Sequence, residues 1–367
     1  MYLSKVEIDL AKIQLNFQRL EAAFPGKVMA PVIKSDAYGH GAVRTALALG
    51  EVGCTHICVF AMDEALQLRL NGIKQRIWVL GGAMPGEEEL IPQIGANTAY
   101  ALWNRGQIAR LNTVAKRNNL CIDIHLTVET GMSRLGFFPS ELPAVLKEIK
   151  AADGLHLCGM FSHLASADNP ESPQTAQQVE RFRAAVALLP PEAKEVHLCA
   201  TPGMMAGAAK DFNYLRPGFA IYGYGHDDRM PELFFEPAMN YKSFVISVKS
   251  IPDGEHISYS ALYTVNGEAH RIAVVPVGYA NGYPRCLGNR AEVLVRGQRA
   301  PIRGRVCMGM MMIDVTNIPD VTPGDEVVLL GKQGDERITG EELAKLAGTI
   351  PYEILCALGK DPNRIYV

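Results

Sequence analysis

Short apolar runs alternate with amphipathic segments up to about residue 230, and this rhythm constrains the fold more than any other feature. The runs are almost continuously apolar, as expected of parallel strands covered on both faces, and the apolar residues between them recur at helical spacing. About eight repeats of strand and helix predict a (β/α)8 barrel. The seventh crossover, residues 200–213, is short and glycine-rich and fits this pattern least well. The candidate strands are residues 28–34, 56–60, 76–82, 97–103, 122–128, 157–164, 195–201 and 214–224.

The pattern changes after about residue 230, where apolar strands are joined by turns and one helix, residues 340–348, is expected. We therefore predict an α/β barrel over residues 1–232 and a separate, mostly-β domain over residues 233–367. The first strand, KVEIDL at residues 5–10, precedes the first helix of the barrel and is compatible with either domain.

The composition and charge of the chain argue against some classes of binding partner. The chain has 367 residues and a net charge of −3, so charge gives no reason to expect binding to nucleic acid or to an anionic membrane. The N-terminus MYLSKVEIDLAK carries charges where a signal peptide needs an apolar core, and no apolar run is long enough to span a bilayer. We expect a cytoplasmic protein.

The eight cysteines include no CxxC pair, which favours free thiols in a reducing compartment. Cys54, His56 and Cys58 alternate and would share one face of a strand, as metal ligands can. Packing of small apolar thiols explains the pattern more simply, and no metal site is expected.

Reactive and charged side chains follow the carboxyl ends of several candidate strands. Lys34 ends the first strand, Arg134 follows the fifth, His163 the sixth and Thr201 the seventh, and Arg216 lies in the eighth. Each has an ordinary structural explanation, such as a satisfied histidine, a salt-bridge partner or a turn. Active sites of (β/α)8 barrels lie at this rim, so their convergence favours catalysis.

The chemistry of this set points to one cofactor. A lysine on an apolar strand suits a Schiff base with a carbonyl, because burial disfavours the ammonium form. Hydroxyl and backbone N–H groups near Thr201 and Gly218 suit a phosphate, and His163 can stack on an aromatic ring. A carbonyl, a phosphate and an aromatic ring together describe pyridoxal phosphate. A phosphosugar aldolase would also explain Lys34 and the phosphate loop but would leave the β domain without a role.

Motifs spread over nearly the whole chain resemble those of bacterial alanine racemases, pyridoxal-phosphate enzymes with a barrel and a β domain. The C-terminal motifs exclude the small single-barrel binders of the same cofactor. In chain order the motifs are VIKSDAYGHG, ETGMSRLG, FSHLASAD, LRPGFAIYG, ISYSALY, PVGYANGYPR, APIRGRVCM and IPYEIL.

The resemblance implies a racemase that interconverts L- and D-alanine and supplies D-alanine for peptidoglycan. Lys34 would hold the cofactor and act as the base on one face of the substrate α-carbon. Tyr259 of the partner subunit would be the base on the other face, so the active site would require a homodimer. Two opposed bases suit racemisation, since one removes the α-proton and the other returns a proton from the far side. In the family, His163 and Arg216 form the hydrogen-bonded chain that makes this tyrosine basic enough.

The resemblance assigns the remaining site residues as well. Arg216 would face the pyridine nitrogen, where a guanidinium donates without giving up its proton, so the ring nitrogen stays unprotonated and side reactions are restrained. Arg134 would contact the phenolic oxygen of the cofactor and the substrate carboxylate, and the backbone at Met308 of the partner subunit would hold that carboxylate too. The phosphate would lie among Tyr38, Thr201, Gly218, Phe219 and Tyr352, and the entrance would be lined by Asp168, Tyr279, Arg285 and Arg305.

Three positions depart from the family. Thr127 stands where many members have a lysine, often carbamylated, that braces the arginine of the GMxRLG motif. Gly309 replaces a common aspartate after the VCM motif, and Ala200-Thr201 replaces Asn-Ser in the phosphate loop. The first two leave open a racemase for serine or for a broader set of amino acids. A barrel-type amino-acid decarboxylase and a cofactor carrier are the alternatives from other classes.

Overall fold

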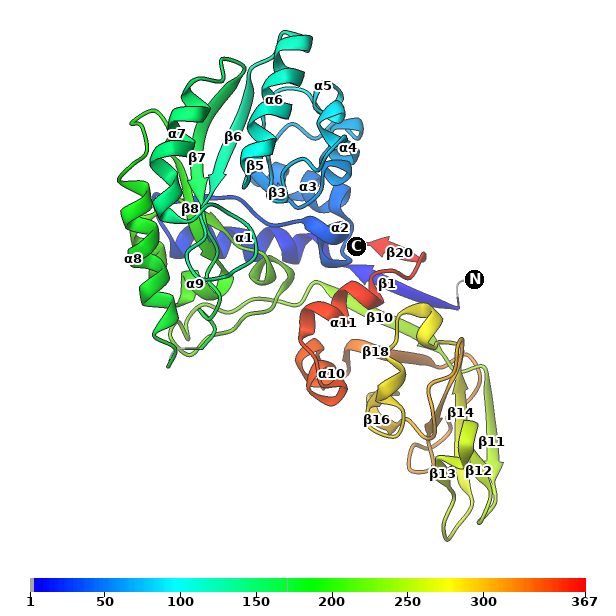
Figure 1. Cartoon of the computed structure of the whole chain (residues 1–367). Coiled ribbons are helices and arrows are strands. Elements are labelled where there is room, and N and C mark those ends of the chain that lie inside the picture. The colour runs from blue at the N-terminus through cyan, green and yellow to red at the C-terminus, as the bar shows by residue number, and fades with distance from the viewer. Residues whose placement is uncertain (1–2, 170) are drawn as a thin grey trace. The chain divides into compact units, whose positions relative to one another are not determined.

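The computed structural model describes residues 3–169 and 171–367 (Figure 1). Contacts divide the chain into two compact units. The barrel unit comprises residues 11–37 and 42–236, and the β unit comprises the N-terminal segment through Leu10, residues 38–41 and residues 237–367.

The barrel unit contains eight parallel strands in the order β2-β9-β8-β7-β6-β5-β4-β3. A parallel bridge between Val32 and Cys58 joins the segment after β2 to β3 and closes the circle. This architecture confirms the predicted barrel fold. The strands are β2 (Val28–Met29), β3 (His56–Val59), β4 (Arg76–Val79), β5 (Thr98–Leu102), β6 (Ile122–Thr127), β7 (Leu155–Phe161), β8 (Glu195–Ala200) and β9 (Tyr214–Arg216).

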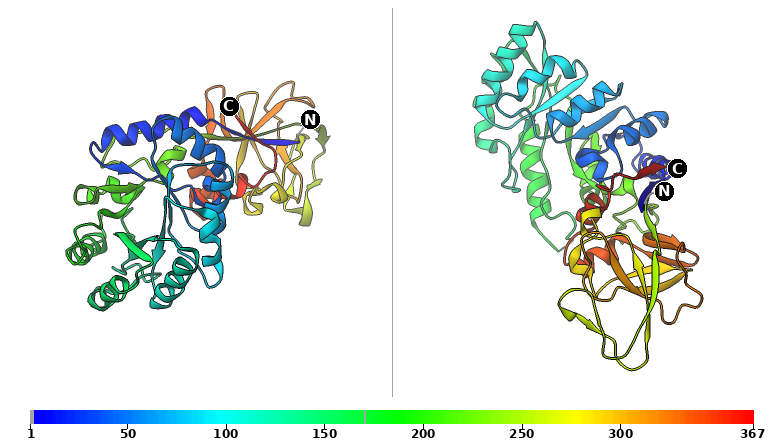
Figure 2. Two further views of the ribbon diagram at one scale, coloured as in Figure 1. Left: turned by 90° about the horizontal axis from the view of Figure 1, so that it is seen from above. Right: turned by 90° about the vertical axis from the view of Figure 1, so that its right-hand side faces the viewer.

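Helices follow the strands and lie outside them (Figure 2). Their local sequences explain where they begin: Asn104 caps α6 by accepting the N–H of Gln107, whose side chain in turn accepts the N–H of Asn104. The seventh crossover contains only one α-helical turn and a 3₁₀ turn, consistent with its glycine-rich sequence. The helices are α1 (Leu10–Ala23), α2 (Lys34–Tyr38), α3 (Ala42–Glu51), α4 (Met62–Leu70), α5 (Ile91–Ile94), α6 (Arg105–Asn118), α7 (Leu142–Lys150), α8 (Gln174–Val186) and α9 (Thr201–Met205), with 3₁₀ turns η1 (Glu87–Leu90), η2 (Pro139–Glu141), η3 (Ala208–Asp211) and η4 (Phe219–Tyr222).

The β unit is built on a seven-stranded sheet in the order β16-β15-β18-β10-β1-β20, with β19 paired to β18. The first strand of the chain, which the sequence left unplaced, lies here, antiparallel to β10 and parallel to β20. A three-stranded sheet, β11-β14-β17, and the hairpin β12-β13 complete the strands. They are β1 (Ser4–Ile8), β10 (Met239–Phe244), β11 (Ser247–Ile251), β12 (His256–Ile257), β13 (Tyr263–Thr264), β14 (His270–Val275), β15 (Glu292–Val295), β16 (Gln298–Pro301), β17 (Met311–Asp314), β18 (Glu326–Gln333), β19 (Glu336–Ile338) and β20 (Arg364–Tyr366).

The β unit has two α-helices among its described residues, one more than expected. Helix α10 (Gly340–Ala347) matches the expected helix, and α11 (Pro351–Leu358) follows it after a short turn. Pro351 occupies the first helical position, where a proline costs no hydrogen bond. The 3₁₀ turns of this unit are η5 (Tyr259–Ala261), η6 (Tyr279–Asn281) and η7 (Arg285–Leu287). Within the described residues, no helix is long and apolar enough to cross a membrane.

Candidate active site

Lys34 begins α2, two residues after the Val32 bridge that follows β2. The residues that come after Lys34 have a left-handed backbone. Ser35, Asp36 and Ala37 all have φ between 53° and 55°, a region that residues with a Cβ rarely occupy. One carboxylate holds this turn: Glu64 of α4 accepts the N–H of Ser35 at 2.5 Å. The other oxygen of Glu64 accepts the N–H groups that follow β3, at 2.8 and 3.0 Å. Glu64 thus links the left-handed turn after Lys34 to the connection between β3 and α4.

Arg216 is buried at the end of β9, with 2% of its surface exposed, and it donates in several directions. Its Nη2 donates to the carbonyl oxygens of Ser162 at 2.8 Å and Leu198 at 3.1 Å and lies 3.4 Å from Nδ1 of His163. Nη1 donates to Nδ1 of His197. Burial lowers the pKa of Arg216 to about 10, so the guanidinium remains charged at neutral pH.

His163 lies just after β7, and its pKa is affected by several positive charges at this rim. Burial and the positive charges of Arg216, Arg134 and Lys34 lower its pKa to about 3. An imidazole in this position is neutral at physiological pH and can accept or donate a hydrogen bond. The structure therefore brings together four residues that the sequence singled out.

Thr201 directly follows β8 and begins α9, and its hydroxyl accepts backbone N–H groups around the start of the η4 turn. The N–H groups of Gly218 and Ala220 each donate to Oγ1 of Thr201 at 3.3 Å. The ring of Phe219, between them, stacks on Tyr224 with centroids 5.0 Å apart. A hydroxyl that accepts main-chain N–H groups keeps its own proton to donate to an anion such as a phosphate.

The loop that carries Arg134 is held from two sides. Glu129 accepts the N–H groups of Gly131 at 2.5 Å and Arg134 at 3.2 Å. From α8, Nε2 of Gln178 donates to Oγ1 of Thr130 at 3.2 Å and to the carbonyl of His163 at 2.9 Å. One buried glutamine therefore links this loop to the residue that follows β7.

Two tyrosines assigned to the phosphate lie close together in the β unit. The rings of Tyr38 and Tyr352 have centroids 5.7 Å apart and are tilted by 50°. Gly39 explains the close approach of this segment to α11, because a Cβ there would lie 2.6 Å from the carbonyl oxygen of Leu355. The positive φ of 84° at Gly39 also favours glycine.

Three other segments of the β unit are joined by hydrogen bonds. Next to Tyr259, the hydroxyl of Ser258 donates to the carbonyl of Arg305 at 2.9 Å. Farther along, the N–H of Tyr279 donates to Cys307 at 3.0 Å, and that of Ala280 to Met308 at 2.9 Å. The side chains of Tyr259 and Met308 are 67% and 62% exposed, which is high for large apolar residues.

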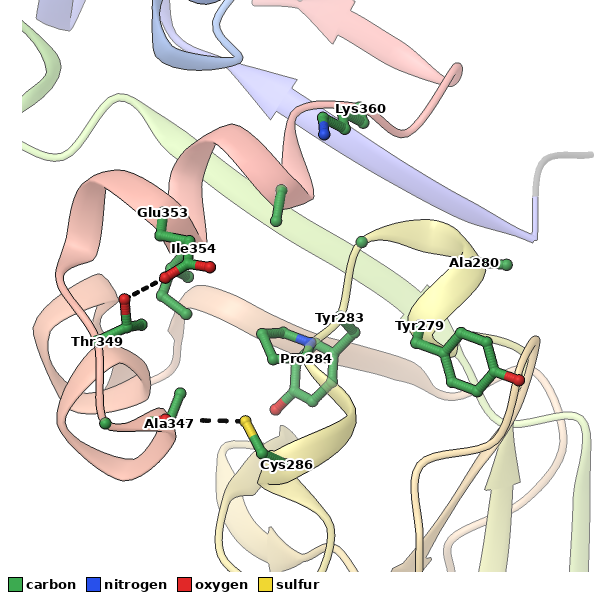
Figure 3. A pocket seen from close by; sticks show the side chains of 13 residues that line it. Tyr279, Ala280, Tyr283, Pro284, Cys286, Ala347, Thr349, Glu353, Ile354 and Lys360 are labelled. Atoms are coloured by element: carbon green, nitrogen blue, oxygen red, sulfur yellow. Dashed lines mark hydrogen bonds between the residues drawn. The ribbon is translucent and has the colours of Figure 1, made fainter.

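A pocket of about 530 Å³ lies beside η6 and is bounded by residues of η6, η7, α10 and α11 (Figure 3). Tyr279 lines it, and Pro284 and Cys286 line it on either side of the exposed Arg285 in the chain. The hydroxyl of Thr349 donates to Glu353 at its far side (Figure 3). Asp168, also assigned to the entrance, is an exposed residue of the barrel unit. The pKa of Arg229 is raised chiefly by its hydrogen bond with Asp227, and the charge of Asp168 adds to this shift.

The structure shows the surroundings of Thr127 and Gly309, two positions that depart from the family pattern. Oγ1 of Thr127 is buried at the end of β6 with no hydrogen-bond partner among the described residues. Gly309 is exposed, and a Cβ added there would meet no atom within 4 Å. The first side-chain atom of an aspartate at position 309 would therefore displace none of its neighbours.

Potential metal ligands converge at one place in the described part of the chain, formed by His125, Cys158 and Glu195. The set differs from the one that the sequence suggested. Arg76 lies within it, with Nη2 3.4 Å from Sγ of Cys158 and Nε 2.8 Å from Oε1 of Glu195. A half-buried guanidinium at that distance repels a cation, so the arrangement favours an ion-pair network over a metal centre.

Sequence patterns did not predict several residues that hold the candidate site residues in place. Glu64, Gln178 and His197 each contact a segment that carries a candidate residue. A signal existed for two of them: Glu64 is the third residue of a helix, where capping glutamates gather, and His197 interrupts an apolar strand. Gln178 lies within an ordinary amphipathic helix, so no pattern marked it.

The fold and this site define a class of protein: an α/β barrel with a lysine-centred polar cluster at the carboxyl rim of its strands, joined to a mostly-β unit. Two family models match, described as the N-terminal domain of alanine racemase at residues 8–226 and its C-terminal domain at residues 238–366. The chain belongs to the alanine racemase family.

Individual relatives agree with this membership. The alanine racemase of Halothermothrix orenii is 36% identical over 98% of this chain and 96% of its own length. Among solved structures, the alanine racemase of Clostridium difficile 630 has a TM-score of 0.92 and 30% identity over 100% of this chain and 96% of that one. The alanine racemase of Bartonella henselae, solved with covalently bound pyridoxal phosphate, has a TM-score of 0.89 and 28% identity over 100% of both chains.

Proposed function

We propose that this protein is a pyridoxal-phosphate-dependent racemase that interconverts L-alanine and D-alanine. The observation that carries the proposal is the polar cluster at the carboxyl rim of the barrel strands: buried Arg216 lies 3.4 Å from Nδ1 of His163, which also feels the charges of Arg134 and Lys34. Membership of the alanine racemase family supports the choice of reaction and substrate.

The residues present fit this cofactor. Lys34 supplies an amine for its aldehyde carbon. The hydroxyl of Thr201 accepts the N–H groups of Gly218 and Ala220 and keeps its own proton to donate to the phosphate, beside the backbone of Gly218 and Phe219. Arg216, charged and held by two backbone carbonyls, supplies a donor for its ring nitrogen. When bound, the cofactor withdraws electrons from the substrate and makes its α-proton acidic.

The chain's own task is then to move one proton on each face of the α-carbon. Lys34 acts as the base on one face, and Tyr259 of the partner subunit acts on the other. The exposure of Tyr259 and Met308 on their own unit supports a role for these side chains against a second copy of the chain. Arg134 is the cation for the substrate carboxylate, since a guanidinium can bind it in a bidentate manner.

Arg216 limits the reaction to racemisation. A guanidinium that stays charged at neutral pH donates a hydrogen bond without transferring its proton, so the electron demand on the ring nitrogen remains moderate. Moderate demand disfavours side reactions that require a fully protonated ring, such as transamination. D-Alanine for peptidoglycan is the use that the family resemblance suggests, and a cytoplasmic location remains a prediction from the sequence.

The test is hydrogen exchange at the α-carbon. The purified protein is incubated with pyridoxal phosphate and L-alanine in deuterated water, while NMR follows the α-proton and chiral chromatography follows both enantiomers. Loss of the proton together with formation of D-alanine is expected, and Lys34→Ala and Tyr259→Phe should each abolish most turnover. Binding of the cofactor without exchange would contradict the proposal and favour a carrier, whereas release of carbon dioxide would favour a decarboxylase.

L-Serine is the second substrate to test, because Thr127 and Gly309 depart from the family near the expected substrate position. Exchange with serine but not with alanine would replace alanine as the substrate and leave the two-base chemistry intact.

A further inference from the structure

A line of hydrogen-bonded side chains runs from Arg216 through the interior of the barrel to Glu195. Nη1 of Arg216 contacts Nδ1 of His197. Nε2 of His197 lies 2.9 Å from Nδ1 of His125, and Nε2 of His125 lies 2.6 Å from Oε2 of Glu195. These residues come from β9, β8 and β6, so the line crosses the sheet rather than following one strand.

The imidazole rings of His125 and His197 are packed against aromatic rings and buried from solvent. His197 is sandwiched between Trp78, with centroids 4.2 Å apart and ring planes 10° apart, and Phe161, at 4.9 Å and 6°. His125 meets the same tryptophan edge-on at 4.9 Å. Neither histidine exposes more than 1% of its surface. Rotation of either ring would disrupt this aromatic packing, so each nitrogen keeps its partner.

Arg216 and Glu195, at the two ends of the line, determine the direction in which its hydrogen bonds are donated. A guanidinium has only donors and an ionised carboxylate has only acceptors, whereas a neutral imidazole has one of each. Burial lowers the pKa of both histidines, so they are neutral at physiological pH. Burial opposes ionisation of Glu195, but the hydrogen bond from His125 and the positive charge of Arg76 outweigh it and lower the pKa of this carboxyl to about 2.

Other contacts keep Glu195 in place as the terminal acceptor. Nε1 of Trp78 donates to Oε2 at 3.1 Å, and Nε of Arg76 forms an ion pair with Oε1 at 2.8 Å. Arg76 is paired in turn with Asp123, at 2.8 Å between Nη2 and Oδ2. The carboxylate thus has a charge partner of its own and does not depend on the histidines for neutralisation.

We propose that Glu195 is a positioning residue for Arg216: it holds His125 and His197 in the Nε2–H tautomer, so that a bare Nδ1 of His197 always faces the guanidinium. With the opposite tautomer, the N–H of His197 would point at an N–H of Arg216, and the two donors would repel each other. The consequence for catalysis rests on the proposed function, because Arg216 is the group offered to the ring nitrogen. The tautomers themselves are properties of the cofactor-free protein.

The test begins with cofactor-free wild-type protein labelled with ¹⁵N-histidine. Long-range ¹H–¹⁵N NMR distinguishes the two tautomers, and we expect Nε2–H for both His125 and His197 at neutral pH. Assignment uses His125→Gln and His197→Gln. An Nδ1–H tautomer or a charged ring at either position would overturn the proposal, and this measurement needs no Glu195 variant that folds.

Glu195→Gln and Asp123→Asn form the matched pair of variants. Each removes one carboxylate paired with Arg76, but only Glu195 contacts His125. We expect Glu195→Gln to give mixed tautomers and to weaken binding of pyridoxal phosphate roughly 10-fold, as loss of outer partners does at other sites, while Asp123→Asn keeps the wild-type tautomers. Equal effects of the two substitutions would overturn the proposal in favour of general electrostatics. Wild-type protein with the expected tautomers but no alanine racemisation would instead contradict the proposed function.

Discussion

At the scale of single residues, the geometry around Lys34 depends on side chains that never touch a substrate. Four consecutive residues, Ser35 to Tyr38, adopt positive φ without a glycine among them. Such a turn is costly for residues with a Cβ and persists only when its surroundings hold it. Glu64 supplies that restraint through the N–H of Ser35 and through two N–H groups after β3.

Substitution of Glu64 tests this restraint. Glu64→Gln keeps one acceptor oxygen but turns an amide toward backbone N–H donors, so we expect a loss of about 2 kcal/mol in the free energy of unfolding and a fall in kcat. Urea denaturation and steady-state kinetics measure the two effects. Asp63→Asn, on the same helical turn but bonded among the described residues only to the N–H of Glu64, should change stability by less than about 0.5 kcal/mol. Equal losses in both variants would contradict the assigned role.

Gly309 offers a test of substrate breadth. Because a Cβ there meets no atom within 4 Å, Gly309→Asp should change the free energy of unfolding by less than about 0.5 kcal/mol. If the missing aspartate widens the entrance, the ratio of kcat/KM for alanine over serine should rise roughly 2- to 10-fold. Gly309→Asn separates the effect of charge from that of bulk. An unchanged ratio in both variants would mean that position 309 does not select the substrate.

At the scale of the elements, the barrel strands carry neutral histidines into an apolar interior. His125 lies in β6, His197 in β8, and His163 directly follows β7. All three have a pKa below the ordinary value of 6.5, and burial is the largest cause in each. Neighbouring positive charges lower the pKa further, whereas Glu195 partly raises that of His125. A folded chain that holds them neutral binds fewer protons in mild acid than an unfolded chain does.

Acid should therefore destabilise the cofactor-free protein well above the range in which carboxylates titrate. The unfolded chain takes up protons as the pH falls below 6.5, whereas folded His163 stays neutral down to about pH 3. Each such histidine lowers the free energy of unfolding by roughly 1.4 kcal/mol per pH unit in this window. Urea midpoints between about pH 7.5 and about pH 5 measure the slope, and His163→Gln should reduce it. A flat profile would contradict the neutral state of these rings.

At the scale of the whole molecule, the proposed bases lie in different compact units of the chain. Lys34 belongs to the barrel unit and Tyr259 to the β unit. The resemblance assigns Tyr259 to the site of a partner subunit, and its exposure on its own unit is consistent with that role. Catalysis would then require two copies of the chain.

A mixing experiment distinguishes a shared site from a site within one chain. Lys34→Ala and Tyr259→Phe are each expected to be inactive, but with a shared site a mixed dimer would contain one site with Lys34 from one chain and Tyr259 from the other. After subunit exchange, we expect recovery of roughly a quarter of the wild-type racemase rate, because half of the random dimers carry one intact site. Lys34→Ala mixed with the double variant is the control and should stay inactive. No recovery despite exchange, shown by a tag on one chain, would place both bases in one subunit.

The barrel and the residues at its rim were predictable because both depend on local patterns. Continuous apolar runs mark strands buried on both faces, and the residue at the end of each run identifies the rim. Lys34 and His163 were found in this way, Arg216 from within a candidate strand, and Arg134 from the segment that follows a strand. The opposite base, Tyr259, came only from the family resemblance, since nothing in its own stretch marks it as reactive. Helix α11 was missed because its short sequence resembles a strand as much as a helix.

The sequence by itself determined the order of the barrel strands and the identity of the side chains at their ends, because periodicity and chain connectivity are local properties. Only the tertiary structure decided which distant residues meet. The pairing of β1 with β10, the support of Ser35 by Glu64 and the line from Arg216 to Glu195 all join residues far apart in the chain. A hydrogen bond forms where a donor and an acceptor come within about 3 Å, and that proximity is set by the closed barrel and the folded sheet rather than by any stretch of sequence.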